Sequence, residues 1–72
     1  MELEVGKKYV NKMGEVYRIT DRFDFEYFPF QGINIETMMT ETFQDDGKWR
    51  LSGDSLNDLV SEYTPPKEET KA

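Results

Sequence analysis

The stretch FDFEYFPF, residues 23–30, decides how the chain is interpreted, because it holds five of the ten aromatic residues. Aromatic and acidic residues alternate through Phe23, Asp24, Phe25, Glu26 and Tyr27. This alternation predicts a strand whose rings lie in the core while the acids face solvent. Proline has no amide hydrogen, so Pro29 is predicted to lie at a sheet edge or to end the strand.

The last residues of the same stretch have a second interpretation. Phe28 and Phe30 flank Pro29 and would then lie exposed on a loop as a binding patch. Exposed aromatic anchors with a charged rim are typical of recognition sites. The two interpretations use different rings, so both can hold.

The segment before this stretch predicts two further strands and a turn. Residues 15–22, EVYRITDR, are rich in the β-branched and aromatic types that suit a pleated surface. The preceding NKMG, residues 11–14, reads as a hairpin turn in which Gly14 can take positive φ. Apolar and acidic residues alternate over residues 1–5, which predicts a short edge strand.

The segment after it also favours extended structure. Residues 33–43 are predicted as one long strand, because their threonine density and lack of capping signals argue against the rival helix. Asp45-Asp46-Gly47 is a strong hairpin signal, and residues 48–52 are predicted as the returning strand.

One short helix is predicted near the end of the sequence, over residues 54–63. Ser55 and Asp58 have the spacing of a capping box, with Asp in the usual Glu position. A stripe of apolar residues at helical spacing follows, made of Leu56, Leu59, Val60 and Tyr63. Two turns of helix are not stable alone in water, so this stripe is expected to pack on the sheet.

These elements predict a mainly β protein with a small, bent antiparallel sheet or SH3-like barrel and one short C-terminal helix. An α+β meander with the helix across one face is the alternative. Residues 1–64 are expected to form a single domain, and residues 65–72 a flexible polar tail.

The composition excludes several classes of chemistry. The sequence has no cysteine and no histidine, which rules out disulfides, Cys/His zinc sites and Ser-His or Cys-His nucleophiles. No acid cluster has the spacing of a calcium loop, and no Gly-rich phosphate loop is present. We therefore expect no metal, no cofactor and no enzymatic activity. No apolar run reaches the length of a membrane span and no leader opens the chain, which predicts a cytoplasmic protein.

Charge is distributed unevenly along the chain, whose formal net charge is −6. Residues 24–46 hold six acids and no base, namely Asp24, Glu26, Glu36, Glu41, Asp45 and Asp46. Binding to phosphates depends on clustered lysine and arginine, so direct nucleic-acid binding through this segment is disfavoured.

Two segments resemble known proteins. GKKYVNKMGEVYRI, residues 6–19, and SLNDLVSEY, residues 55–63, are similar to the two ends of small accessory proteins encoded by tailed bacteriophages. Such proteins are often made early in infection and bind host factors, including antiviral defence systems. The resemblance implies a viral protein acting on a host protein in the bacterial cytoplasm, and it assigns no functional residue.

The sequence thus predicts a partner-binding protein that inhibits or modulates a host protein. Its predicted interface consists of the anchors Phe28 and Phe30 and the rim acids Asp24, Glu26, Asp45 and Asp46. A nucleic-acid mimic that blocks a DNA- or RNA-handling enzyme is one alternative, and a binder of a small nucleotide signal is another. Both a monomer and a homodimer are compatible with the sequence.

Overall fold

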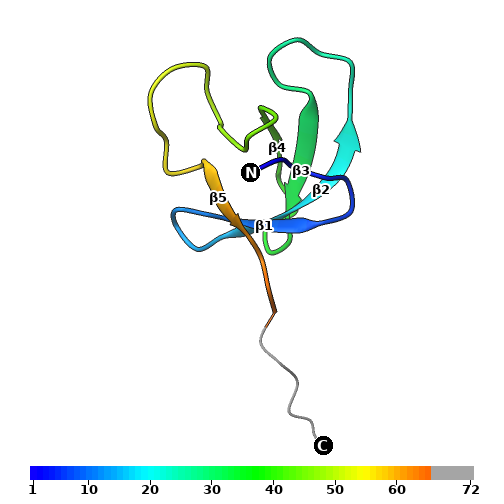
Figure 1. Ribbon diagram of the computed structural model, residues 1–72. Helices are drawn as coiled ribbons and strands as arrows, with labels where there is room; N and C mark the ends of the chain where they lie inside the picture. Colours follow the sequence, from blue (N-terminus) through cyan, green and yellow to red (C-terminus); the bar gives the residue numbers. More distant parts are fainter. Residues whose placement is uncertain (66–72) are drawn as a thin grey trace, which may run out of the picture.

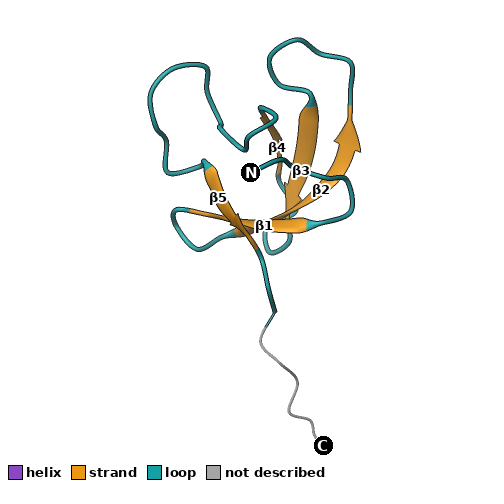
Figure 2. Cartoon of the chain, in the orientation of Figure 1, coloured by secondary structure: helices purple, strands orange, loops and turns teal. Residues whose placement is uncertain are grey.

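A computed structural model describes residues 1–65, and within them the secondary structure consists of strands joined by turns, with no helix (Figure 2). The strands are β1 (Lys8–Asn11), β2 (Val16–Arg22), β3 (Phe30–Asn34), β4 (Thr40–Phe43) and β5 (Leu59–Glu62). The mainly β prediction is therefore confirmed.

The five strands form one antiparallel sheet in the order β4-β3-β2-β1-β5, so the last strand returns to pair with the first (Figure 1). The sheet does not close, but backbone hydrogen bonds outside the ladders draw its two edges together. The amide of Leu59 in β5 donates to the carbonyl of Gly47, 2.9 Å away, just beyond β4. The amide of Leu3 donates to the carbonyl of Asp45 at 3.1 Å.

The core lies inside the bend of this sheet. Its buried apolar side chains come from the N-terminal segment and from all five strands: Leu3, Tyr9, Tyr17, Ile19, Phe30, Phe43 and Leu59. The rings of Tyr17 and Phe43 meet edge to face, with centroids 5.5 Å apart. Residues 1–5 do not form the predicted strand, yet Leu3 is buried and its amide is bonded, so the segment is fixed as part of the core wall.

The β1–β2 turn forms as the sequence predicts, because Asn11 organises it. The Asn11 side-chain oxygen accepts hydrogen bonds from the amides of Met13 and Glu15, both at 2.9 Å. Gly14 takes φ of 82°, in the left-handed region that glycine enters without steric cost.

The predicted long strand over residues 33–43 is wrong, since two strands and a turn occupy it. The buried side chain of Asn34 accepts hydrogen bonds from the amides of Glu36 and Thr37, at 2.9 and 3.2 Å. An asparagine that bonds the backbone two and three residues ahead favours a turn over continued strand pairing. β4 then pairs back along β3, with Phe43 opposite Phe30.

The predicted helix over residues 54–63 is also wrong. Residues 55–58 form a turn closed by the Asp58 amide, which donates to the Ser55 carbonyl at 3.0 Å, and β5 follows directly. Leu59 is 4% exposed whereas its neighbour Val60 is 51% exposed, as expected for adjacent strand residues that face opposite sides of a sheet. The open edge of β1 supplies the backbone partners that a two-turn helix would have to supply for itself.

Two further predictions concern the segments on either side of that turn. Residues 48–52 do not form the predicted returning strand and belong to a long loop instead. The predicted flexible tail, residues 65–72, lies outside the described residues except for Pro65.

Candidate functional site

The loop of residues 23–29, called here the aromatic loop, joins β2 to β3 and presents three exposed rings. Phe23, Phe25 and Tyr27 are 38%, 60% and 55% exposed. The rings of Phe23 and Phe25 stack with centroids 5.3 Å apart. The Phe23 amide donates to the carbonyl of the buried Pro29 at 2.6 Å, so the loop is pinned at its base.

The structure reverses the two predicted sets of rings. Phe23, Phe25 and Tyr27 were expected in the core and are exposed, whereas Phe30 was expected to be exposed and is 5% exposed within the core. Phe28 is half-buried.

The physical reason for this reversal is that β2 ends at Arg22. Residues 23–29 therefore lose the strand alternation, and β3 restarts it at Phe30 with Gly32 and Asn34 on the same buried face. The signal that could have located the break is Pro29, whose missing amide fits a strand start better than a strand interior.

The predicted rim acids lie on two loops that project from the same end of the molecule (Figure 1). Asp24 and Glu26 are exposed on the aromatic loop. Asp45 and Asp46 are exposed at the start of the second loop, residues 44–58, which is called here the β4–β5 loop. This end of the molecule, called here the apical end, therefore combines exposed rings with carboxylates.

A cleft with a volume of about 440 Å³ opens between the N-terminal segment and the base of the aromatic loop. Its lining carries three acids and one base: Glu2, Leu3, Glu4, Val5, Arg22, Phe30 and Asp45. The Arg22 guanidinium carbon lies 5.5 Å from the centroid of the Phe30 ring, a cation–π distance. With more carboxylates than bases in its lining, this cleft disfavours a nucleotide phosphate.

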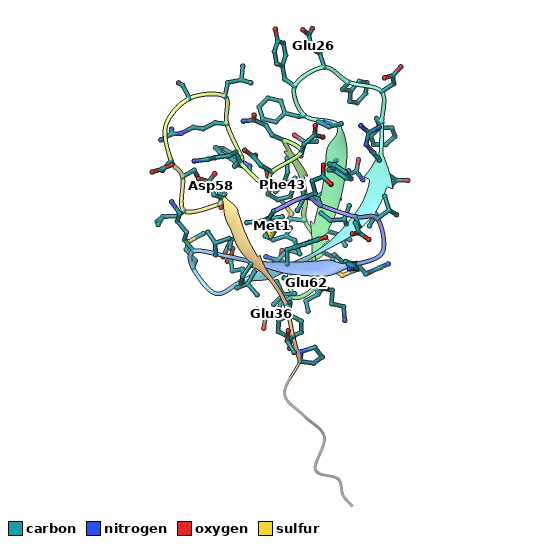
Figure 3. The ribbon with its side chains drawn as sticks, in the orientation of Figure 1. Met1, Glu26, Glu36, Phe43, Asp58 and Glu62 are labelled. Atoms are coloured by element: carbon teal, nitrogen blue, oxygen red, sulfur yellow. The ribbon has the colours of Figure 1, made fainter. Side chains whose placement is uncertain are left out.

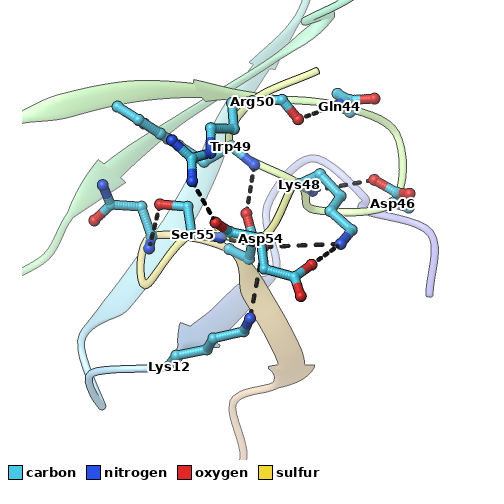
Figure 4. A network of polar contacts seen from close by, with 10 residues as sticks. Lys12, Gln44, Asp46, Lys48, Trp49, Arg50, Asp54 and Ser55 are labelled. Atoms are coloured by element: carbon cyan, nitrogen blue, oxygen red, sulfur yellow. Dashed lines mark hydrogen bonds and ion pairs between the residues drawn. The ribbon is translucent and has the colours of Figure 1, made fainter. Parts of the chain in front are cut away.

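The β4–β5 loop is held by the carboxylate of Asp58, a residue that is 2% exposed (Figure 4). Its Oδ1 accepts a hydrogen bond from the Trp49 amide at 2.8 Å, and its Oδ2 accepts one from the Ser55 amide at 2.9 Å. Two lysine ammonium groups approach Oδ2, Lys12 at 3.8 Å and Lys48 at 3.9 Å. One buried acid thus joins both halves of the loop to the β1–β2 turn.

This environment keeps Asp58 ionised. Burial, the largest single influence on the carboxyl, raises its pKa. The two amide hydrogen bonds and the two lysine charges together outweigh burial, so the pKa of Asp58 lies below its ordinary value of 3.8. The spacing of Ser55 and Asp58 was interpreted from the sequence as a helix cap. The role of the Asp58 carboxylate in holding the β4–β5 loop was therefore not predicted.

A second, exposed ion pair stiffens the tip of the same loop. The Lys48 ammonium lies 2.6 Å from Oδ1 of Asp54, and Arg50 donates to the Asp54 carbonyl at 2.7 Å (Figure 4). The hydrogen bond and charge of Lys48 lower the pKa of the Asp54 carboxyl. Leu51 and Leu56 remain exposed on this loop, and the Leu56 carbonyl accepts a hydrogen bond from the Lys12 amide of the β1–β2 turn at 3.2 Å.

Comparisons and searches for other kinds of site give no positive result. Within residues 1–65, no group of three or more acidic side chains is arranged to hold a metal ion. No helix in the described part of the chain is long and apolar enough to cross a membrane. No protein-family model matches the chain, and searches of curated proteins and of solved structures also found no match.

Proposed function

We propose that the protein binds another protein through the apical end, with Phe23, Phe25 and Tyr27 as its anchors. The observation that carries this proposal is the stacked and exposed Phe23–Phe25 pair on a loop pinned at its base. Aromatic side chains lose little conformational entropy when they bind and dominate the energetics of interfaces. Exposed rings also keep apolar surface in contact with water, which is unfavourable in free energy. A partner that covers the rings removes this surface from water.

The rim of this interface is acidic. Asp24 and Glu26 flank the rings, and Asp45 and Asp46 lie at the start of the β4–β5 loop, where Asp45 lines the same cleft as Arg22. A partner surface that carries lysine and arginine around an apolar pocket complements this arrangement, and complementary charges chiefly raise the rate of association.

The partner is proposed to be a host protein, and the effect of binding to be inhibition or modulation of it. The support is the resemblance of residues 6–19 and 55–63 to accessory proteins of tailed bacteriophages, which act on host factors such as antiviral defence systems. We also propose that the sheet is an SH3-like open barrel. Two hydrogen bonds to the segment after β4 support this assignment, one from Leu59 of the opposite edge strand to Gly47 and one from Leu3 of the N-terminal segment to Asp45.

Affinity purification from a bacterial lysate, followed by mass spectrometry, identifies the partner, and binding of the purified pair then tests the interface. The double variant Phe25→Ala, Tyr27→Ala removes two exposed rings and is expected to stay folded. Truncating an anchor ring costs about 2 kcal/mol or more, so affinity is expected to fall by at least about a hundredfold. Val60→Ala, which shortens an exposed apolar side chain of β5 outside the aromatic loop, is the matched control and is expected to bind like the parent.

Charge reversal separates this interface from nucleic-acid mimicry. The double variant Asp24→Lys, Glu26→Lys is expected to slow association and weaken its salt dependence, with a smaller loss than ring removal. A mimic behaves oppositely, with charge reversal dominant and ring removal nearly silent. If the ring variant is folded and binds the partner as tightly as the parent, the proposed interface is wrong.

A further inference from the structure

A second exposed apolar surface lies at the other end of the molecule, in the turn between β3 and β4. Figure 3 places Glu36 of this turn and Glu26 of the aromatic loop at opposite ends. Met38 and Met39 follow Glu36 and are 65% and 63% exposed. Neither methionine belongs to the buried core cluster, so their exposed apolar side chains have no packing role in the core of the described residues.

The backbone at Met38 is strained, and the turn around it is rigid. Among residues 1–65, Met38 is the one residue other than glycine with positive φ, at 66°. A side chain with a Cβ disfavours this region, which glycine and asparagine occupy at lower cost. The turn nevertheless holds Met38 there, because its amide donates to the Asn34 carbonyl at 2.8 Å and the Asn34 amide donates to the Met39 carbonyl at 2.8 Å. Strained residues held by their surroundings are concentrated at functional sites.

A groove of about 300 Å³ begins beside this turn. It lies among the β1–β2 turn, the start of β2, the β3–β4 turn and the end of β5, and its lining comprises Met13, Gly14, Glu15, Val16, Ile35, Glu36 and Tyr63. Its walls are fixed to one another, since the Ile35 amide donates to the Val16 carbonyl at 3.1 Å. The groove is therefore a formed feature of mixed polar and apolar lining, in which Met13, Val16 and Ile35 lie beside two carboxylates.

We propose that this basal surface, defined as the groove together with Met38 and Met39, binds a segment of a partner protein that carries an apolar anchor flanked by lysine or arginine. Methionine side chains are flexible and polarisable, and they adapt to apolar side chains of different shapes. The groove receives the anchor, and Glu15 and Glu36 pair with the flanking bases.

Charge complementarity decides among the possible occupants. The lining includes two acids and no base, and the chain has a formal net charge of −6. A second copy of the chain would bring the same carboxylates against this surface, and anionic lipids or nucleic acids would be repelled by it. A basic protein segment is the occupant that this surface attracts. With one binding surface at each end, the protein can hold two proteins at once.

The test adds a synthetic peptide of alternating leucine and lysine to the isotope-labelled full chain. NMR spectroscopy monitors the amide chemical shifts of the chain during this titration. The expected result is a saturable change confined to residues 13–16, 35–39 and 63. Two control peptides replace lysine by glutamate or leucine by serine, and each is expected to bind weaker by about tenfold or more. Equal binding of either control, changes centred on the aromatic loop, or no saturable change overturns the proposal.

The variant Met38→Gly separates binding from folding. Glycine relieves the strained backbone, so the variant is expected to melt at the same temperature as the parent or higher. It removes an exposed side chain of the basal surface, so the affinity for the leucine–lysine peptide is expected to fall several-fold. Unchanged peptide affinity in the folded variant overturns the proposal. So does a dimer of the parent, detected by sedimentation equilibrium, that Met38→Gly dissociates, because the occupant would then be a second copy.

Discussion

The carboxylate of Asp58 accepts a hydrogen bond from the backbone amide of Trp49, with 2.8 Å between Oδ1 and the nitrogen, across nine residues of a loop without regular structure. Because Trp49 also packs against the core and donates from its indole nitrogen to Glu41 at 2.9 Å, the contact ties the loop to β4 as well as to β5. The β4–β5 loop is therefore held by the buried contacts of Asp58 and Trp49, and its exposed tip extends from these contacts.

Replacing Asp58 is expected to destabilise the fold strongly. Asp58→Ala leaves the amides of Trp49 and Ser55 without their acceptor, and each buried donor left unsatisfied costs about 1–3 kcal/mol. Asp54→Ala is the matched control, because Asp54 is exposed and pairs only at the surface, where solvent screens an ion pair and leaves it little effect on stability. Urea unfolding measures both free energies. Equal and small losses in the two variants would show that the Asp58 contacts do not hold the loop.

The Asp58 carboxyl also makes the free energy of unfolding depend on pH. The pKa of Asp58 in the folded protein lies below 3.8, its ordinary value, so the unfolded chain takes up a proton more readily. Its contribution is full well above pH 3.8 and is lost as the pH falls below that value towards the folded pKa. The stability difference between the parent and Asp58→Asn is expected to shrink over this range in urea titrations at several pH values. A difference that is constant from neutral pH down to this range contradicts the assignment.

Gly47 is expected to tolerate a side chain less well than Gly14. Both have positive φ, 95° and 82°, so alanine strains the backbone at either position, at a cost of about 1–3 kcal/mol. At Gly47 a Cβ would also lie 2.9 Å from the carbonyl oxygen of Leu59, while at Gly14 it would meet no atom within 4 Å. Gly47→Ala is therefore expected to lower the melting temperature more than Gly14→Ala. Equal shifts would mean that β5 moves freely away from Gly47.

Leu59 and Val60 are adjacent in β5 and face opposite sides of the sheet. Leu59→Ala is expected to cost about 2–5 kcal/mol because it leaves a cavity in the core, a large share of the stability of so small a domain. Val60→Ala removes an exposed side chain and is expected to stay within about 0.5 kcal/mol of the parent. Thermal unfolding of the two variants measures the contrast. Similar losses would indicate that the segment is not a strand with one buried face.

The sequence was sufficient for the mainly β class and for the turns at residues 11–14 and 45–47. The first turn is organised by the Asn11 side chain, and in the second Oδ1 of Asp46 accepts a hydrogen bond from the Lys48 amide at 3.1 Å. The turn after Asn34 is equally local, but the threonine density of residues 33–43 favoured a continuous strand, so this turn was missed.

Two other elements that were wrong depend on partners distant in sequence. Leu56 and Leu59 have helical spacing, but the free edge of β1, about fifty residues away, makes the segment from Leu59 onward a strand. Likewise, the alternation of residues 23–27 fits a strand, but β3 begins only at Phe30 and pairs back from there onto β2. For short apolar runs, tertiary pairing decides the structure.

The exposure of the predicted interface residues could be predicted in part. The acids Asp24, Glu26, Asp45 and Asp46 were expected to be exposed and are exposed, on the aromatic loop and at the start of the β4–β5 loop. It could not identify which rings are exposed, because that depends on the register in which β3 meets β2. Phe30 lies opposite Arg22 in that register and faces the core.

The position of β1 in the sheet has a consequence for how the protein is made. β1 lies between β2 and β5, so the second strand that it pairs with is the last one in the described sequence. Contacts between residues so far apart in sequence slow folding, because the entropy of closing the intervening chain is lost before the contacts form. During synthesis, β1 and β2 can pair early, but the sheet stays incomplete until residues 59–62 have left the ribosome. The sheet is therefore completed only when residues 59–62 can pair, and until then the chain exposes an unpaired edge of β1 to other chains.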